Sequence, residues 1–332
     1  MGGRRTNLAL LLLLAIAFAT GWLAFSFTSL DSRLALVVHG LAGLAILGLL
    51  PWKSLLAKRS LARRRRELVS LAALLLGLLV LVSIGFGVLH SSGGPFLWTV
   101  PLLDRVPVVR DLTAMDFHVG AALALLPLVV WHLLARPVRV RPTDLSRRVF
   151  LRFGLLLGAA GAALVVLPSA TRAPTGSYRL GELPSTSWMF DAVPAPASDR
   201  WSLLAGSRRW TYAELAAFTD RASAVIDCTG GWYSEQEWEG AWLSRLLPPA
   251  QLAGAGSVVV RSATGYWRRF AVADLGRLLL ATRVAGADLS PGNGHPVRLV
   301  APGQRGFWWV KWVVELRPDP LPWWWQPPYP TQ

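Results

Sequence analysis

Long apolar runs alternate with short polar segments over the first half of the chain. Each run is close to the roughly 20 residues that cross a bilayer as an α-helix. In the second half the apolar residues come in shorter groups, separated by Gly, Pro and charged residues. The pattern therefore predicts an α-helical transmembrane bundle of about five spans, followed by a domain outside the bilayer. The apolar runs cover residues 7–30, 34–52, 68–89, 117–135 and 150–168.

The second half predicts a mixed α/β domain of about 150 residues, large enough for its own core. Residues 176–210 are rich in Pro, Ser and Gly and are expected to form a linker and an irregular entry, followed by a short helix over 210–218. Strands are predicted at 224–227, 257–261, 297–300 and 308–316, and short helices at 242–247 and 272–281. The expected divisions are 1–170 for the bundle, 176–318 for the folded domain and 319–332 for a Pro/Trp-rich tail.

Charge orients the predicted spans. The chain has 332 residues and a net charge of +15, and its Lys and Arg residues cluster between the second and third runs and between the fourth and fifth. Such loops are cytoplasmic in membrane proteins. Five spans that begin inside end outside, so the residues from about 170 onward are expected to be extracytoplasmic. Because the charges gather at helix ends, nucleic-acid binding is not expected.

A twin-arginine pattern precedes the fifth run. Residues 146–152 read Ser-Arg-Arg-Val-Phe-Leu-Arg, with Arg147 and Arg148 as the pair. This pattern is typical of an export signal for domains that cross the membrane already folded, often with a cofactor inserted beforehand. The alternative is a basic flank on an ordinary membrane helix. No convincing cleavage site follows near 169–173, so the fifth span is expected to remain as an anchor.

Four of the five histidines fall within or at the ends of the apolar runs: His39, His90, His118 and His132. Polar groups in a membrane are costly and usually functional. His118 and His132 share one helix face about 21 Å apart, a spacing that resembles the ligand pairs of dihaem b-type cytochromes. His132 has no histidine partner at its depth. We therefore expect one b-type haem near the outer face, ligated by two of the other three, with interfacial histidines as the alternative.

The chain contains one cysteine, Cys228, which excludes an internal disulfide. Residues 225–232 read Val-Ile-Asp-Cys-Thr-Gly-Gly-Trp, and 265–267 read Gly-Tyr-Trp. Residues 293–302 read Asn-Gly-His-Pro-Val-Arg-Leu-Val-Ala-Pro, followed by Gly306 and Lys311-Trp312. In this order and at these spacings, the motifs resemble the molybdenum-cofactor domain of the sulfite oxidase family over roughly 176–318.

The resemblance implies a molybdenum-molybdopterin cofactor, with the Cys228 thiolate as the protein ligand to the metal. An arginine would grip the cofactor phosphate through its planar fork and a lysine as a point charge. The implied cofactor contacts are Asn293, His295, Arg298 and Lys311, with backbone donors at Trp309 and Val310. Singly, each has an ordinary structural explanation, such as a buried cysteine, a solvated basic residue or a turn histidine before proline.

The chain departs from the family after the cysteine. Sulfite oxidases continue with an asparagine and arginines that help to bind the anion, whereas residues 229–235 here read Thr-Gly-Gly-Trp-Tyr-Ser-Glu. This departure argues against sulfite as the substrate. For the tyrosine-containing cofactor contact of the exported methionine-sulfoxide reductases, the nearest candidate is the segment 187–190.

The predicted function is that of a membrane-anchored molybdopterin oxidoreductase, which exchanges electrons with the membrane, through b-type haem, for oxygen-atom transfer on an extracytoplasmic substrate. The chain resembles the protein-methionine-sulfoxide reductase system, with its separate haem-containing membrane subunit, in one polypeptide. Expected partners are an S-oxide or other sulfur substrate, a quinone or cytochrome, and the twin-arginine translocation machinery. The alternatives are a noncatalytic anchor or assembly protein that keeps the cofactor fold, and a molybdenum enzyme whose bundle is only an anchor.

Overall fold

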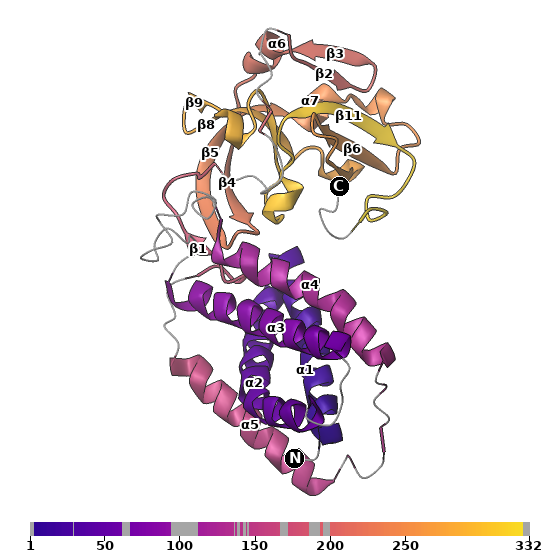
Figure 1. Ribbon diagram of the computed structural model, residues 1–332. Helices are drawn as coiled ribbons and strands as arrows, with labels where there is room; N and C mark the ends of the chain where they lie inside the picture. The colour runs from indigo at the N-terminus through magenta and orange to yellow at the C-terminus, as the bar shows by residue number, and fades with distance from the viewer. Residues whose placement is uncertain are drawn as a thin grey trace. The chain divides into compact units, whose positions relative to one another are not determined.

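The chain divides into two compact units, Met1–Tyr178 and Arg179–Gln332, of which the first is helical and the second is mainly β-sheet (Figure 1). The computed structural model describes residues 3–28, 30–61, 67–93, 112–135, 137, 140–141, 144, 146–166, 172–185, 193–194 and 200–327. Each unit is considered by itself.

Among the residues that the structure describes, five helices of the N-terminal unit are long and apolar enough to cross a membrane, which agrees with the predicted number of spans. Their bounds differ from the predicted runs mainly around the first turn, because the first helix ends at Ser26 and the second begins at Leu30. The second helix also continues well past the apolar run and contains Pro51. The helices are α1 Gly3–Ser26, α2 Leu30–Leu61, α3 Glu67–Gly93, α4 Ala114–Ala135 and α5 Arg147–Val166.

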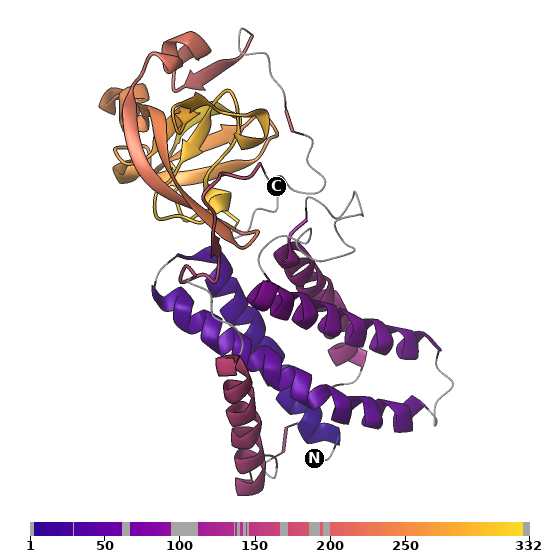
Figure 2. The same cartoon turned by 90° about the vertical axis from the view of Figure 1, so that its left-hand side faces the viewer.

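The helices pack as two pairs with a fifth helix at the side. α1 packs along α2, α3 packs along α4, and α5 contacts α2 (Figures 1 and 2). Glycines on α2 allow α5 to approach closely, since a Cβ added at Gly40 or Gly48 would lie 3.1 or 3.0 Å from a leucine methyl of α5. The apolar core of the bundle contains Leu13, Ala42, Ala45, Ile46, Leu49, Val80, Leu125 and Ala160.

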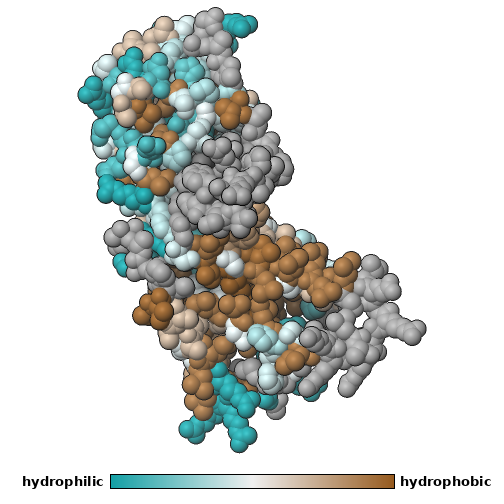
Figure 3. Space-filling model, turned by 60° about the vertical axis from the view of Figure 1, so that its left-hand side comes forward, coloured by the Kyte–Doolittle hydropathy of each residue, from teal (hydrophilic) through white to brown (hydrophobic). Residues whose placement is uncertain are grey.

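The outer surfaces of these helices are strongly apolar. Phe150, Leu155 and Val165 are each at least 75% exposed, and Figure 3 shows hydrophobic residues spread over the helices, in contrast to the mostly polar surface of the strands. Apolar patches of this extent are rare on soluble proteins, whereas lipid accepts them because a helix bonds its own backbone. The helices are therefore those of a multi-pass membrane protein.

The C-terminal unit contains two β-sheets. One follows the order β1-β5-β8-β10, with β4 paired to β5 and β9 to β8, and the other follows β3-β2-β11-β6-β7. β4 and β5 form a long, curved antiparallel hairpin (Figure 2). The strands are β1 Tyr178–Arg179, β2 Ser202–Ala205, β3 Arg208–Thr211, β4 Asp220–Cys228, β5 Trp232–Trp242, β6 Ser257–Ser262, β7 Trp267–Ala271, β8 Leu279–Val284, β9 Ala287–Asp288, β10 Arg298–Val300 and β11 Val313–Asp319.

Short helical segments connect these strands. The α-helices are α6 Tyr212–Ala216 and α7 Leu243–Leu246, and the 3₁₀ turns are η5 Pro249–Gln251, η6 Val272–Asp274, η7 Pro291–Asn293 and η8 Gly306–Trp308. Thr211 caps α6 by accepting the Glu214 amide while the Glu214 carboxylate accepts the Thr211 amide. The start of the Pro/Trp-rich segment returns to the second sheet, where the Gln326 side chain exchanges hydrogen bonds with the backbone of Arg269.

The mixed α/β class is confirmed, as are the strands at 224–227, 257–261 and 297–300 and the helix at 242–247. The helix predicted at 272–281 is wrong, because only η6 is helical there and β8 begins at Leu279. Residues 278–281 are all buried, and an apolar run buried on both faces has the same sequence pattern in a strand and in a buried helix.

Other predicted bounds need correction. Trp210 and Thr211 belong to β3 rather than to the following helix, and the strand predicted from Trp308 begins only at Val313. The longest strand, β5, was not predicted. Its exposed and half-buried positions carry Glu and Gln, and because Glu is uncommon in strands, the sequence of β5 lacks the composition typical of a strand.

Candidate functional site

Cys228 stands at the end of β4, where the hairpin turns into β5. Cys228 pairs with Trp232 across the sheet, so three residues, Thr229 to Gly231, make the turn. Gly231 takes a φ of +85°, which favours glycine, and its amide donates to the Cys228 carbonyl at 3.1 Å. The Gly230 amide donates to Cys228 Sγ at 3.4 Å. An N–H group directed at sulfur favours the thiolate, which is the form that binds metals.

A buried ion pair fixes the backbone beside this cysteine. The carboxylate of Asp227 pairs with the guanidinium of Arg305, and both side chains are less than 8% exposed. Arg305 also donates to the Cys228 carbonyl at 3.4 Å. A Cβ at Gly306 would lie 3.0 Å from Cys228 Cα, so only glycine allows η8 to pack this closely. The turn before η8 therefore holds the end of β4 in place.

The segment around η7 brings Arg298 and Lys311 together. Gly294 has a φ of +106°, and a Cβ there would lie 3.0 Å from Arg298 Cβ and 3.2 Å from Lys311 Cβ. Arg298 donates to the Asn293 carbonyl at 3.2 Å, and Lys311 donates to the Gly292 carbonyl at 2.6 Å. The loop at 292–294, β10 and the residue two before β11 thus meet at one place.

Arg298 is a buried cation within this cluster. It is 2% exposed, and its guanidinium carbon lies 5.3 Å from the ring centroid of Trp238 and 5.8 Å from that of Trp309. Its Nε has no hydrogen-bond partner among the described residues, and none of the ion pairs found there includes Arg298. A buried charge without a counterion is costly. The place therefore suits an anion.

Electrostatics support this conclusion. Burial and, to a lesser extent, the nearby positive charge of Arg298 together lower the pKa of Lys311 to about 7, while negative charge at Cys228 acts in the opposite direction. Burial also lowers the pKa of Arg298 to about 10, again opposed by Cys228. Two cations close enough to disfavour each other, and both close enough to be stabilised by a thiolate, would gain from a bound anion that spans them.

His295 lies in the same loop, between Gly294 and a proline joined to it by a cis peptide bond. Its ring centroid is 5.5 Å from that of Tyr212. Its Nδ1 atom is buried and makes no hydrogen bond to any described residue. A buried polar atom of this kind is expected to find a partner in a ligand or in ordered water.

Trp309 and Val310 are 2% and 1% exposed, and their amides already have partners. The Trp309 amide donates to the Gly306 carbonyl at 3.0 Å, and the Val310 amide donates to the Trp308 carbonyl at 3.1 Å. Within the described residues both amides are therefore used inside the loop. Trp309 instead contributes a ring that packs on Arg298 and on Trp238.

The four membrane histidines occupy different environments. The rings of His39 and His118 are neighbours, with centroids 5.6 Å apart. His90 contacts Tyr178, with ring centroids 5.2 Å apart, and His132 lies in the last turn of α4. The other sequence candidate, 187–190, lies outside the described residues.

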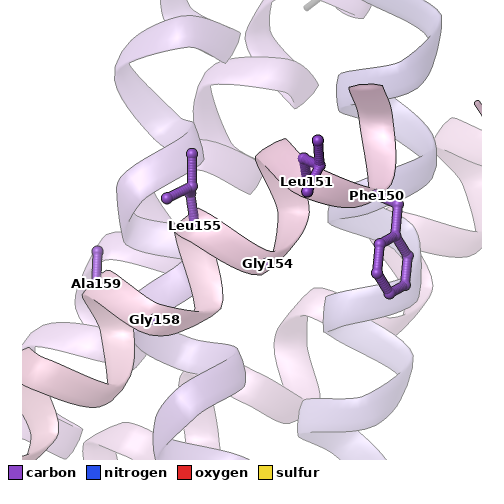
Figure 4. Close-up of a pocket in the computed structure, with 6 residues that line it drawn as sticks. All are labelled: Phe150, Leu151, Gly154, Leu155, Gly158 and Ala159. Carbon is purple, nitrogen blue, oxygen red and sulfur yellow. The ribbon is translucent and has the colours of Figure 1, made fainter. Parts of the chain in front are cut away.

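A shallow hollow on α5 is lined by residues without polar or reactive side chains. It is lined from one helix only, by Phe150, Leu151, Gly154, Leu155, Gly158 and Ala159, and none of these has a polar side chain (Figure 4). Its apolar character fits a lipid-facing surface.

Two supporting residues were not predicted as part of the site. Asp227 and Arg305 hold the cysteine backbone. Asp227 had a signal in the sequence, because it directly precedes the only cysteine. Trp238 is one of several aromatic residues that the sequence offers as a lining of the site, with core packing as the commoner explanation, and it covers Arg298.

The residues fit a molybdopterin. A partly exposed cysteine beside an amide donor can supply a soft thiolate, and buried cations with an unpartnered Arg298 Nε can receive a phosphate. Residues 192–320 match the family model described as the oxidoreductase molybdopterin binding domain. This match confirms the molybdopterin domain that the motifs predicted.

Among solved structures, the chain is similar to the crystal structure of the sulfane dehydrogenase SoxCD from Paracoccus pantotrophus, with 24% identity and a TM-score of 0.37 over 39% of this chain and 40% of that chain. The match thus spans well under half the length of that relative. No curated protein matches the chain. On the strength of the family model, residues 192–320 of the C-terminal unit form an oxidoreductase molybdopterin-binding domain.

Proposed function

We propose that the protein is a membrane-anchored molybdopterin oxidoreductase that exchanges electrons with the membrane for oxygen-atom transfer on an extracytoplasmic substrate. The observation that carries this proposal is the combination of Cys228 at a strand end with the buried cations Arg298 and Lys311. When bound, the molybdenum cofactor supplies two-electron redox chemistry coupled to oxygen-atom transfer. The substrate class is an S-oxide, an N-oxide or a small molecule that accepts oxygen.

In this proposal Cys228 is the thiolate ligand of the metal. The Gly230 amide stabilises negative charge on the sulfur, and the Asp227–Arg305 pair fixes the position of the cysteine backbone. The pair is buried and the Gly306 contact is close, so the backbone that carries the sulfur is held between the two. A fixed ligand geometry lowers the reorganisation that accompanies a change of charge at the site.

Arg298 and Lys311 would bind the cofactor phosphate, with Asn293 and His295 as polar neighbours. Lys311 has a pKa of about 7 without a ligand, so an anion would draw a proton onto its Nζ and raise that pKa. The rings of Trp238 and Trp309 exclude water from the Arg298 side and strengthen the charge interaction. Trp309 and Val310 act in this scheme as a packed wall.

The membrane unit would place the site outside the cell membrane. Arg147 and Arg148 are exposed at the start of α5, so the twin-arginine translocation machinery can reach them. With basic loops in the cytoplasm, the residues after α5 face the outer side. Electrons would come from, or go to, a quinone or cytochrome through a b-type haem in the bundle, and the closeness of His39 and His118 supports that step.

Metal analysis with a reduced-minus-oxidised visible spectrum tests the proposal on the full chain purified in detergent. The compared proteins are the wild type, Cys228→Ser and the neighbouring control Thr229→Ser. We expect stoichiometric molybdenum in the wild type and in the control, and loss or altered binding of the metal in Cys228→Ser, with an equal b-type spectrum in all three.

Two results would redirect the proposal. Absence of molybdenum from wild-type protein made in a cofactor-competent host would contradict the enzyme and favour a noncatalytic anchor that keeps the fold. Molybdenum without any haem spectrum would limit the bundle to an anchor or a quinone-binding unit.

A further inference from the structure

Two membrane histidines from different helix pairs meet inside the bundle. His39 is on α2, which packs along α1, and His118 is on α4, which packs along α3. Their ring centroids are 5.6 Å apart and their planes are nearly perpendicular, at 83°. Placing an imidazole group in a bilayer interior costs free energy, and such groups are usually functional. The contact therefore requires an explanation beyond helix packing.

Hydrogen bonds fix the same tautomer in both rings. His39 Nδ1 lies 2.8 Å from the Ala17 carbonyl, and His118 Nδ1 lies 2.7 Å from the Ser83 carbonyl. A carbonyl oxygen only accepts, so each neutral ring carries its proton on Nδ1 and keeps a lone pair on Nε2. Metal-ligating histidines have this arrangement, in which the other ring nitrogen donates to a backbone carbonyl.

Each ring also lies against a glycine on the partner helix. A Cβ at Gly21 would be 2.9 Å from the His39 ring, and a Cβ at Gly87 would be 3.0 Å from His118 Nδ1. In both helix pairs the glycine follows the bonded carbonyl residue by four positions, since Gly21 follows Ala17 and Gly87 follows Ser83. The α1–α2 pair and the α3–α4 pair thus hold one imidazole each by the same device.

Two imidazoles alone do not bind a bare metal ion well. Structural zinc takes four protein ligands, and no group of three or more His, Cys, Asp or Glu residues suited to a metal occurs within the described ranges. A metal here must bring its remaining ligands with it, as haem iron does. A haem would bring its remaining ligands, and His39 and His118, with ring centroids 5.6 Å apart, would supply one imidazole nitrogen each.

The sequence has no C-x-x-C-H motif for c-type haem attachment. That motif needs two cysteines, and the only cysteine of the chain is Cys228 in the other unit. The proposed haem is therefore of the noncovalent b type.

The other two histidines differ from this pair. His90 Nε2 faces the Gly176 carbonyl at 3.3 Å and its ring packs against Tyr178, so its Nε2 is already a donor. His132 follows His118 by fourteen residues on the same helix, which places it about 21 Å further along the axis. Both histidines are suitable controls.

We infer that His39 of α2 and His118 of α4 are the two residues that would ligate one b-type haem in the bundle. The inference rests on the proposed function, because it identifies the group that would carry electrons through the bundle, but its spectroscopic signature does not depend on molybdenum. The candidate haem ligands are thereby reduced to one pair, and His90 and His132 are not expected to bind the haem.

The test measures haem per protein by pyridine haemochrome and low-spin bis-histidine signals by electron paramagnetic resonance, on the full chain in detergent. The variants are His39→Ala and His118→Ala, with His90→Ala and His132→Ala as controls. We expect at least about a tenfold loss of haem in the first two, as for removal of a metal ligand or its support, partial return of the spectrum with added imidazole, and near wild-type haem in the controls. Gly21→Leu is expected to lower haem content without removing a ligand.

Haem retained in His39→Ala and His118→Ala, equal loss in the His90 control, or no haem in the wild type would each overturn the inference. Molybdenum is measured in every sample. Haem bound by the His39–His118 pair without any molybdenum would support this inference and contradict the proposed enzyme, whereas molybdenum without haem would do the reverse. If the alanine variants do not fold, Gly21→Leu with its intact histidines decides the result.

Discussion

The two units place their apolar residues differently: the bundle exposes many of them on its outer surface, whereas the C-terminal unit buries them in its core. In the bundle, Phe150 and Leu155 are more than 70% exposed, whereas Leu299 and Val313 of the C-terminal unit are fully buried. The first arrangement is stable in lipid and the second in water. In both units the candidate chemistry lies at polar groups enclosed by apolar packing, at the half-buried His39 and His118 in one unit and at the half-buried Cys228 and buried Arg298 in the other. Enclosed polar groups are therefore better guides to function here than composition.

The two units also support their reactive groups differently. The histidines are held by backbone carbonyls and glycines of neighbouring helices. Cys228 is held by a side-chain ion pair, and its loop is closed by a glycine contact. This difference predicts which substitutions each unit tolerates.

The largest effect on stability is expected from Asp227→Asn, which leaves Arg305 as an unpaired buried charge. Breaking one side of a buried pair costs about 3–5 kcal/mol. We expect a large decrease in the unfolding temperature of the C-terminal unit, measured by calorimetry or by limited proteolysis. The exposed pair Arg208–Glu214 provides the control, and Glu214→Gln should cost less than about 1 kcal/mol of pair energy. Equal effects would show that the buried pair does not fix the site.

A leucine truncation in each unit tests the comparison of environments. Leu299→Ala removes a fully buried side chain and should cost about 2–5 kcal/mol. Leu155→Ala removes a side chain that is 75% exposed on α5, and should change stability in detergent by about 0.5 kcal/mol or less. Thermal unfolding of both variants measures the difference. A strongly destabilised Leu155→Ala protein would mean that this face of α5 is covered by protein rather than by lipid.

Replacing Arg298 by lysine keeps the charge but removes the planar fork that lies between two tryptophan rings. Arginine and lysine are not equivalent at such a site. We expect Arg298→Lys to retain about 10- to 100-fold less cofactor after purification, in the range reported for lost support of a metal site. Arg283→Lys, on an exposed ion pair of β8, serves as the control. Full cofactor content in Arg298→Lys would show that charge alone suffices.

A smaller, pH-dependent effect is expected from Lys311 in cofactor-free protein. Its ordinary pKa of 10.5 falls to about 7 on folding. Between these values the unfolded chain binds a proton that the folded chain has released, so stability rises with pH across that window and the contribution is constant below it. The melting temperature of the wild type should therefore gain on that of Lys311→Met between pH 7 and 9. A difference in melting temperature that does not change with pH would mean that Lys311 Nζ is in water. Bound cofactor should abolish the pH dependence of this difference.

The sequence predicted the parts of this molecule that depend on local patterns. Five apolar runs predict five helices, whereas the grouping of Asn293, Arg298 and Lys311 is implied by the family resemblance and agrees with their closeness in the structure. Gly306 is also one of the motif residues of the resemblance, and the structure explains why glycine is needed there, since η8 packs closely against Cys228.

Long-range pairings and two-sided burial were not predictable in this way. Nothing local joins Asp227 to Arg305, and the strand β8 looked helical because its residues are buried on both faces. The hydrogen bonds from α1 and α3 that distinguish His39 and His118 from His90 were not predictable either, because spacing along a single helix cannot reveal them. Those contacts are made by packing between elements.

X-ray absorption at the molybdenum edge tests the central claim most directly, with wild-type protein and Cys228→Ser compared in the same detergent. The account predicts molybdenum in the wild type with sulfur ligands from both the dithiolene and the cysteine, and the loss of one sulfur contribution, or of the metal, in the variant. Molybdenum with an identical sulfur environment in both proteins would contradict the assignment of Cys228 as its ligand.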